Sequence, residues 1–412
     1  METKNRVLVL GGDGFCGWAT SLHLSRRDFD VTIVDNLSRR FIDRQLGVES
    51  LTPISSIERR LAAWKAATAK TIDFVNMTIG EDFTDLVDLL RTLRPGTIIH
   101  FAEQRAAPYS MKSPHEARYT VRNNLCATHD VLCAMVEAGC DAHLVHLGTM
   151  GVYGYGAAGL KIPEGYLPVS VRSEEGVTDL EILYPSNPGS IYHMTKAQDQ
   201  LFFAYYNKNY GLRITDLHQG IVWGTETDET CLDESLINRF DYDGDYGTVL
   251  NRFLMQAAIG HPLTVHGTGG QTRAFIHIRD SVRCVELATQ NPPERGARVN
   301  ILNQLTETHR LIDLARHICE ISGASLRLVP NPRNEAPEND LFASNAKFLA
   351  LGLRPTLLND ALMSEIVGIA RKYAHRCDRL KIPSESLWAP NKAHPGEARA
   401  EAPSALSPMS AV

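Results

Sequence analysis

Two residues near the middle of the chain have the types and the spacing of an acid–base pair. Tyr192 and Lys196 are four residues apart, so on a helix they would lie on one face, one turn from each other. A nearby ammonium favours the phenolate and lowers the pKa of a tyrosine. The pair therefore predicts a general acid or base that works near neutral pH. Such spacing is also common on solvated helix faces, so a second signal is needed.

The second signal is a glycine-rich loop at the start of the chain. An apolar strand is expected at 6–10 and a helix through about residue 27, with the pattern G-x-x-G-x-x-G between them. Glycines there allow a tight turn and bring backbone N–H groups close to a diphosphate. The loop predicts a dinucleotide site, and the residues expected to line it are Gly11, Gly14, Phe15, Cys16 and Gly17.

Asp35 ends the second apolar strand, 31–35, and points to the identity of the dinucleotide. A carboxylate at this place accepts hydrogen bonds from ribose hydroxyls and repels a 2′-phosphate. Asn36 follows it and is expected in the same site. Arg39 and Arg40 are also expected at the cofactor. They could face a phosphate, but we expect NAD rather than NADP.

The composition excludes several classes of function. The chain has 412 residues, of which 43% are hydrophobic and 22% charged, and a formal net charge of -6, as is ordinary for a globular protein. This acidic balance gives no basis for binding nucleic acid or an acidic membrane surface. No apolar run reaches the roughly 20 residues of a membrane span, so no membrane insertion is expected. The first residues lead into a strand without a signal-peptide pattern, which favours a cytoplasmic location.

Strands and helices alternate through the first half of the chain. Strands expected at 97–101 and 142–149 and helices at about 81–94, 120–138 and 192–210 predict an α/β fold with a doubly wound parallel sheet, a Rossmann domain. Residues 37–70 read as an inserted helical segment, capped by Ser55 with Glu58. A smaller, interleaved substrate domain is expected to follow. The predicted division is an NAD-binding domain at 1–217 with part of 276–309 returning to it, a mainly substrate-binding domain at 218–385, and a disordered tail at 386–412.

Taken together, the glycines, Asp35, a threonine at a strand end and the tyrosine–lysine pair resemble the extended short-chain dehydrogenase/reductase family of nucleotide-sugar enzymes. The stretches 100–110, 147–151, 219–220, 227–230 and 269–273 resemble the branch of this family that makes a sulfonated nucleotide sugar. The resemblance implies bound NAD, UDP-glucose and sulfite as substrates, and a homodimer formed through two long helices of each subunit.

The resemblance also implies roles for single residues. Tyr192 would take the proton from the sugar O4, Thr149 would hydrogen-bond the same oxygen, and Lys196 would bind the nicotinamide ribose. His193 is the candidate acid–base group for the later C5–C6 chemistry, because histidine titrates near neutrality. Gln219 is expected at the cofactor, and no metal is expected. The residues expected to bind substrate are Gln104, Arg105, Thr149, Asn251, Gln271, Arg273, Arg333 and Glu335.

Two features leave alternatives open. Met150 stands where sugar 4,6-dehydratases carry an acid, which argues against that reaction, whereas Val152 stands where the sulfonating branch commonly carries glutamate. The alternatives are a UDP-glucose 4-epimerase or 4,6-dehydratase, and a non-catalytic NAD-binding regulator that has lost its chemistry. The presence of Thr149, Tyr192 and Lys196 disfavours the regulator.

Overall fold

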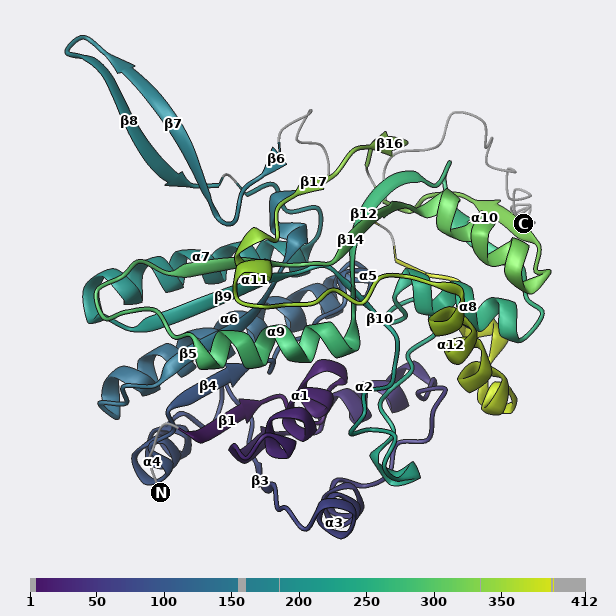
Figure 1. Ribbon diagram of the computed structural model, residues 1–412, viewed down its shortest axis with the longest axis horizontal. Coiled ribbons are helices and arrows are strands. Elements are labelled where there is room, and N and C mark those ends of the chain that lie inside the picture. Colours follow the sequence, from purple (N-terminus) through teal and green to yellow (C-terminus); the bar gives the residue numbers. More distant parts are fainter. Residues whose placement is uncertain (1–4, 155–160, 185, 334, 387, 389–412) are drawn as a thin grey trace, which may run out of the picture.

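A parallel β-sheet forms the centre of the larger lobe (Figure 1). The computed structural model describes residues 5–154, 161–184, 186–333, 335–386 and 388. Within these residues seven strands pair in the order β13-β9-β5-β4-β1-β2-β3, all parallel, which confirms the predicted Rossmann fold. The strands are β1 (Arg6–Leu10), β2 (Asp30–Asp35), β3 (Asp73–Asn76), β4 (Thr97–His100), β5 (His143–Thr149), β9 (Arg213–Gln219) and β13 (Asn300–Gln304).

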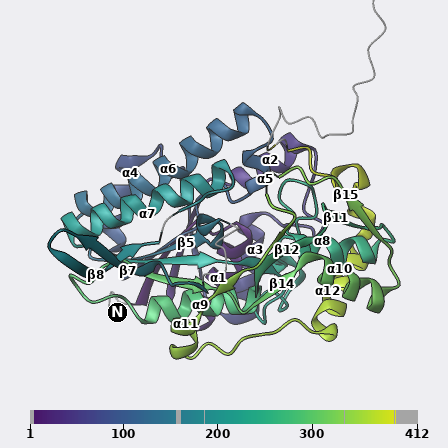
Figure 2. The same ribbon diagram turned by 90° about the horizontal axis from the view of Figure 1, so that it is seen from above.

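Helices cover both faces of this sheet, as the continuous apolar strands require. On one face lie α4 (Phe83–Leu93), α6 (Pro114–Glu137) and α7 (Ile191–Tyr210), with α6 and α7 side by side (Figure 2). On the other face lie α1 (Phe15–Arg26), α9 (Ile278–Gln290) and α11 (Ala346–Ala350). Each helical layer has its own apolar core, one centred on Trp18 and Phe348 and the other on Leu90 and Phe203.

A smaller lobe packs beside the carboxyl edge of the sheet. Its core contains Trp223, Phe253 and Met363, all at most 2% exposed. No helix in the described ranges is both long and apolar enough to cross a bilayer. The lobe is built from β10 (Ile221–Trp223), α8 (Val249–Ala258), β11 (Leu263–His266), β12 (Gly270–His277), β14 (Glu307–Arg310), α10 (Leu311–Ser322), β15 (Leu326–Val329), β16 (Glu338–Asn339) and α12 (Asp360–Lys372).

Shorter elements join the two lobes. β13 is a strand of the large sheet, and α9 and α11 pack on that sheet, whereas the segments around them belong to the small lobe. The chain therefore passes between the lobes more than once. The domain limits given above stay a prediction. The connecting elements are α2 (Ser38–Leu46), α5 (Ala107–Ser110), β6 (Lys161–Ile162), β17 (Phe342–Ala343) and the short 3-10 helices at Met150–Tyr153, Glu234–Leu236, Ala374–Arg376 and Arg379–Lys381.

The inserted segment is helical, but its cap differs from the prediction. Helix α3 (Ile57–Thr68) begins after Ser56, whose hydroxyl accepts the N–H of Arg59 at 3.4 Å, so the assignment of Ser55 as the cap was wrong by one residue. The helix is held to the sheet layer by Trp64, which is fully buried and donates its indole N–H to Ser25 at 3.0 Å.

Two features were not predicted. A two-stranded hairpin of β7 (Tyr166–Ser173) and β8 (Gly176–Leu183) projects from the body of the molecule (Figure 1). Ser386 and Trp388, assigned to a disordered tail, instead lie against the main cavity, and Ser386 is only 2% exposed. The rest of that tail, 387 and 389–412, lies outside the described residues.

Candidate active site

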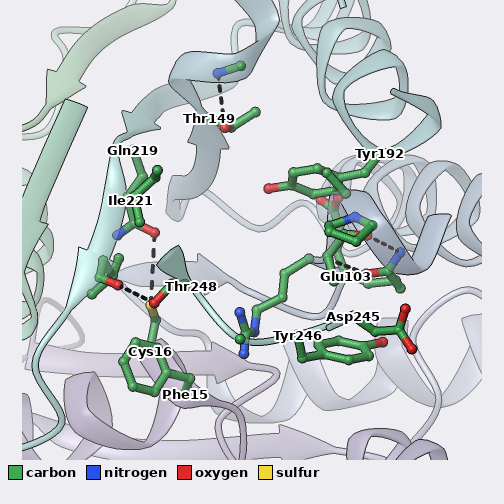
Figure 3. A pocket seen from close by; sticks show the side chains of 18 of the residues that line it. Phe15, Cys16, Glu103, Thr149, Tyr192, Gln219, Ile221, Asp245, Tyr246 and Thr248 are labelled. Atoms are coloured by element: carbon green, nitrogen blue, oxygen red, sulfur yellow. Dashed lines mark hydrogen bonds between the residues drawn. The ribbon is translucent and has the colours of Figure 1, made fainter. Parts of the chain in front are cut away.

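The site is a cavity of about 360 Å³ between the carboxyl edge of the large sheet and the small lobe (Figure 3). Strand ends, the glycine loop and the first turn of α7 supply one wall, and the small lobe supplies the other. This is where open α/β sheets place their ligands, because the loops leaving parallel strands diverge there. Most of the predicted cofactor and substrate residues line it, namely Gly11, Gly14, Phe15, Cys16, Gly17, Asp35, Asn36, Arg39, Gln104, Arg105, Thr149, Tyr192, His193, Lys196, Gln219, Gln271, Arg273, Arg333 and Glu335.

The glycine loop has the close backbone approach that a dinucleotide needs. A Cβ atom on Gly17 would lie 2.1 Å from the carbonyl oxygen of Gly11, and Gly11 has a φ of +81°. Gly14 caps α1, and the first residues of this helix line the cavity with no N-cap side chain over the helix end. Such a cradle at a helix N-terminus fits a diphosphate.

Asp35 lines the cavity next to the glycine loop and would hold the ribose of a bound dinucleotide. Its Oδ2 accepts the N–H of Asp13 at 2.9 Å and its Oδ1 accepts the N–H of Leu37 at 2.7 Å, which fixes the carboxyl group at the cavity wall. Burial, together with the nearby Asp13 carboxylate, raises the pKa of Asp35 to about 6.

The two arginines that could have bound a 2′-phosphate are paired with carboxylates. Arg40 does not line the cavity and donates to both oxygens of Asp13 at 2.6 and 2.7 Å. Arg39 lines it, but it pairs with Asp43 and with Asp241. Both observations fit NAD better than NADP, because neither guanidinium is left to neutralise an additional phosphate.

Tyr192 and Lys196, the predicted acid–base pair, both lie in α7, which confirms the expected helix. Ser190 caps this helix and accepts the N–H of His193 at 3.1 Å, which fixes the first turn at the cavity. Burial raises the pKa of Tyr192 to about 12, against the lowering effects of Lys196 and of the Thr149 hydroxyl. The predicted fall in the pKa of Tyr192 is therefore wrong for the protein alone, because burial outweighs the ammonium.

His193 also faces the cavity, although consecutive helix residues normally diverge. Its ring packs directly on Gly151, where a Cβ atom would lie 2.3 Å from Cδ2 and Nε2. Its Nδ1 lies 3.1 Å from the Ser190 hydroxyl. Burial, and then the charges of Arg333 and Arg273, lower the pKa of His193 to about 3, so the expectation that it titrates near neutrality is wrong for the protein without substrate.

Cationic groups gather at the small-lobe end of the cavity. Arg273 pairs with Glu335 at 2.5 Å, and the guanidinium of Arg333 lies 4.8 Å from the ring of Trp388. Gln271 is nearly fully buried beside them. Asn251 does not line the cavity, since its side chain bonds the backbone of Gly224 instead.

Gln104 and Arg105 also line the cavity. Gln104 donates to Thr120 Oγ1 at 2.8 Å and so braces the loop after β4. Arg105 pairs with Asp241 at 2.5 Å and remains one-third exposed toward the cavity. The carboxylate that holds Arg105 comes from the other lobe, 136 residues away, and nothing in the local sequence indicates it.

The lining also includes residues without a predicted role, among them Glu103, Ser386 and Trp388. For Trp388 the sequence did carry a signal, because a tryptophan is unusual in a segment rich in alanine, proline and serine. Val152 is 1% exposed in an apolar cluster and does not line the cavity. The valine side chain therefore lies outside the site where we expect the substrate.

The comparisons with known proteins agree with this geometry. The family model "NAD dependent epimerase/dehydratase family" matches residues 7–301. The UDP-sulfoquinovose synthase of spinach chloroplasts is 46% identical over 393 residues, covering 93% of this chain and 79% of the relative. The UDP-sulfoquinovose synthase of Sulfolobus acidocaldarius is 37% identical over 359 residues, covering 85% and 88%.

Solved structures show the same fold. A UDP-glucose 4-epimerase from Thermotoga maritima superposes with a TM-score of 0.65 at 20% identity, covering 90% of this chain and 99% of the other. A dTDP-glucose 4,6-dehydratase from Streptomyces venezuelae gives 0.64 at 21% identity, covering 89% and 97%. The chain therefore belongs to the NAD-dependent epimerase/dehydratase family and, within it, to the family of the UDP-sulfoquinovose synthases.

Proposed function

We propose that this protein converts UDP-glucose and sulfite into UDP-sulfoquinovose. The observation that carries the proposal is the 46% identity to the spinach synthase over 93% of the chain. The geometry supports it, because Thr149, Tyr192 and Lys196 line one cavity together with the glycine loop. The epimerase and 4,6-dehydratase alternatives rest on relatives at 26% identity or less and on the fold alone.

The first half of the reaction is an oxidation at C4 of the glucose. NAD, when bound, supplies the hydride acceptor for C4 and returns the hydride at the end of the cycle. Tyr192 takes the proton of the O4 hydroxyl, and Thr149 donates a hydrogen bond that orients this oxygen. The ammonium of Lys196 offsets the charge that develops on the tyrosine. The product of this half is a 4-ketone, which makes the hydrogen on C5 acidic.

The second half replaces the C6 hydroxyl with a sulfonate. A base removes the C5 proton, the C6 hydroxyl leaves as water, and a C5–C6 double bond conjugated to the ketone results. The sulfur lone pair of sulfite then forms the C–S bond at C6, and C5 regains a proton. Return of the hydride to C4 and of the Tyr192 proton to O4 completes the product.

His193 is our candidate for the C5–C6 proton transfers. Its pKa of about 3 reflects burial and the charges of Arg333 and Arg273. A diphosphate or sulfite bound between these arginines would cancel their charge and raise the pKa of the imidazole toward the range useful for catalysis. Substrate binding would thus make His193 basic enough to accept the C5 proton.

The direct test is incubation of the purified protein with UDP-glucose and isotopically labelled sulfite. A labelled, sulfonated nucleotide sugar supports the proposal. UDP-galactose, or a 4-keto-6-deoxy sugar without label, would assign the chain to one of the alternatives. Tyr192→Phe should abolish product formation while NAD stays bound, since the phenyl ring fills the same space without an exchangeable proton.

We also propose a homodimer and a cytoplasmic location. The outer face of α7 carries the exposed apolar side chains Leu201, Tyr205 and Tyr210, at 63%, 56% and 51% exposure. An exposed apolar stripe on a long helix beside a second long helix, α6, suits pairing with the same stripe of another copy. The location remains a prediction, because the spinach relative is chloroplastic.

A further inference from the structure

A buried cluster of charged side chains lies beside the tyrosine–lysine pair, and the reaction steps above do not use it. Glu103 follows β4, His146 lies in β5, and Asp199 lies three residues after Lys196 in α7. The side chains of Glu103, His146 and Asp199 are at most 2% exposed, and one polar atom from each lies within 4.8 Å of the others. The ammonium of Lys196 lies among them, 2.8 Å from Glu103 Oε2 and 3.0 Å from His146 Nε2.

Glu103 is held firmly in this position. Its Oε1 accepts the hydroxyl of Thr128 at 3.1 Å and lies 3.0 Å from His146 Nε2 and 3.6 Å from His100 Nε2. Burial alone would raise the pKa of Glu103, but Lys196 and His146 outweigh it and hold that pKa well below its usual range. The carboxylate is therefore charged at physiological pH and is fixed against the ammonium.

We propose that Glu103 is a positioning residue that holds the Lys196 ammonium and competes with the Tyr192 phenolate for it. An ammonium with a carboxylate at 2.8 Å is largely neutralised and stabilises a second anion less strongly. Glu103 and Tyr192 both line the cavity, so the carboxylate also acts on the phenolate as a like charge (Figure 3).

This competition suits the proposed function, on which the inference rests. A reaction that withdraws the O4 proton and later returns it needs a tyrosine that is stable in both forms. A phenolate that the ammonium stabilised fully would take the proton readily and return it poorly. Glu103 keeps the two forms closer in free energy.

Other titratable and polar groups also face Tyr192 and Glu103 and contribute to their pKa values. Burial and Lys196 act to lower the pKa of His146, but Asp216, 2.8 Å from its Nδ1, and Glu103 raise it to about 9. The groups facing Tyr192 are Lys196, Glu103, Arg105, His193 and Thr149, and those facing Glu103 are Lys196, His146, His100, Thr128 and Asp199.

The test is a direct titration of Tyr192 in the NAD-loaded protein. Tyrosinate absorbance is followed against pH for each protein and for the same protein carrying Tyr192→Phe, so that the other tyrosines cancel in the difference. Glu103→Gln should lower the pKa of Tyr192 by about one unit, because the ammonium is released to the phenolate. An unchanged or higher pKa overturns the proposal.

Glu103→Asp gives a second, milder change. It keeps the charge but draws it back by one methylene from Lys196, so the pKa of Tyr192 should fall to a value between those of the wild type and of Glu103→Gln. This variant decides the question if Glu103→Gln does not fold. A pKa of Tyr192 in Glu103→Asp at or above the wild-type value overturns the proposal.

Asp199→Asn is the matched control. Neither carboxyl oxygen of Asp199 has a hydrogen-bond partner among the described residues, and burial, followed by Glu103, raises its pKa well above the usual range. The change replaces a carboxyl group close to Lys196 with an amide of the same shape and leaves the contact of Glu103 with the ammonium in place, so the titration of Tyr192 should move much less than in Glu103→Gln. A shift in Asp199→Asn equal to that in Glu103→Gln would attribute both to packing and refute the role of charge.

The pH profile of product formation separates the two proposals. In Glu103→Gln the rising limb of this profile should move to lower pH along with the titration. Wild-type protein that forms no sulfonated product refutes the proposed function, while the titration still decides the role of Glu103. Wild-type turnover with an unshifted Glu103→Gln titration refutes the role of Glu103 alone.

Discussion

Gly151 and His193 occupy the same corner of the cavity, and the histidine explains the glycine. A Cβ atom at position 151 would lie 2.3 Å from the imidazole, so Gly151→Ala should displace the ring. We expect product formation to fall about 100-fold, as for an ångström-scale misplacement of a catalytic group, with NAD binding retained. Gly189→Ala, which meets nothing within 4 Å, is the control. Full activity in Gly151→Ala would exclude His193 from the chemistry.

Asp35 makes cofactor affinity dependent on pH. Burial raises its pKa to about 6, and only the carboxylate can accept hydrogen bonds from both ribose hydroxyls. The affinity for NAD should therefore be full above this pH and fall as the pH drops through it, as measured by calorimetry on protein stripped of cofactor. Asp35→Asn should bind weakly with a flat profile, whereas Asp30→Asn, exposed on the same strand, should keep the wild-type dependence. A flat wild-type profile contradicts the prediction.

At the scale of elements, helix α3 offers a test of the corrected cap. Ser56→Ala removes the acceptor for the N–H of Arg59 and should lower the free energy of unfolding by about 0.5 kcal/mol, the lower end for a cap because the bond is long and exposed. Ser55→Ala should leave stability unchanged. Denaturant unfolding of both variants decides between the two serines, and equal effects would contradict the assignment.

The elements that could be predicted from sequence are those with a strong local signal. The glycine loop, the apolar strands and helix α7 contain turn residues or an apolar periodicity. These signals lie in neighbouring residues and do not depend on contacts with the rest of the fold. The β7–β8 hairpin was not predicted, because its strands stay mostly exposed and its apolar side chains, among them Val171, Leu180 and Ile182, pack into none of the apolar cores. The pairing of Arg105 with Asp241 depends on contact between lobes, so only the folded chain reveals it.

At the scale of the whole molecule, the fold leaves an apolar stripe on α7 uncovered. Leu201→Glu should separate the proposed dimer into monomers, because it places a charge where two copies would meet. Leu349→Glu, on α11 at the opposite face and 46% exposed, should leave the assembly unchanged. Sedimentation velocity distinguishes the species. A wild-type monomer, or a Leu201→Glu dimer, would rule out this face as the interface.

Trp388 gives the molecule a built-in optical reporter. Of the four tryptophans, Trp18, Trp64 and Trp223 are fully buried, whereas Trp388 is half-buried at the cavity beside Arg333. A water-soluble quencher should therefore dim its fluorescence selectively. A nucleotide that binds at Arg333 should shield Trp388 and reduce this quenching. Substrate binding could then be followed in unlabelled protein, in real time, before any bond is made or broken.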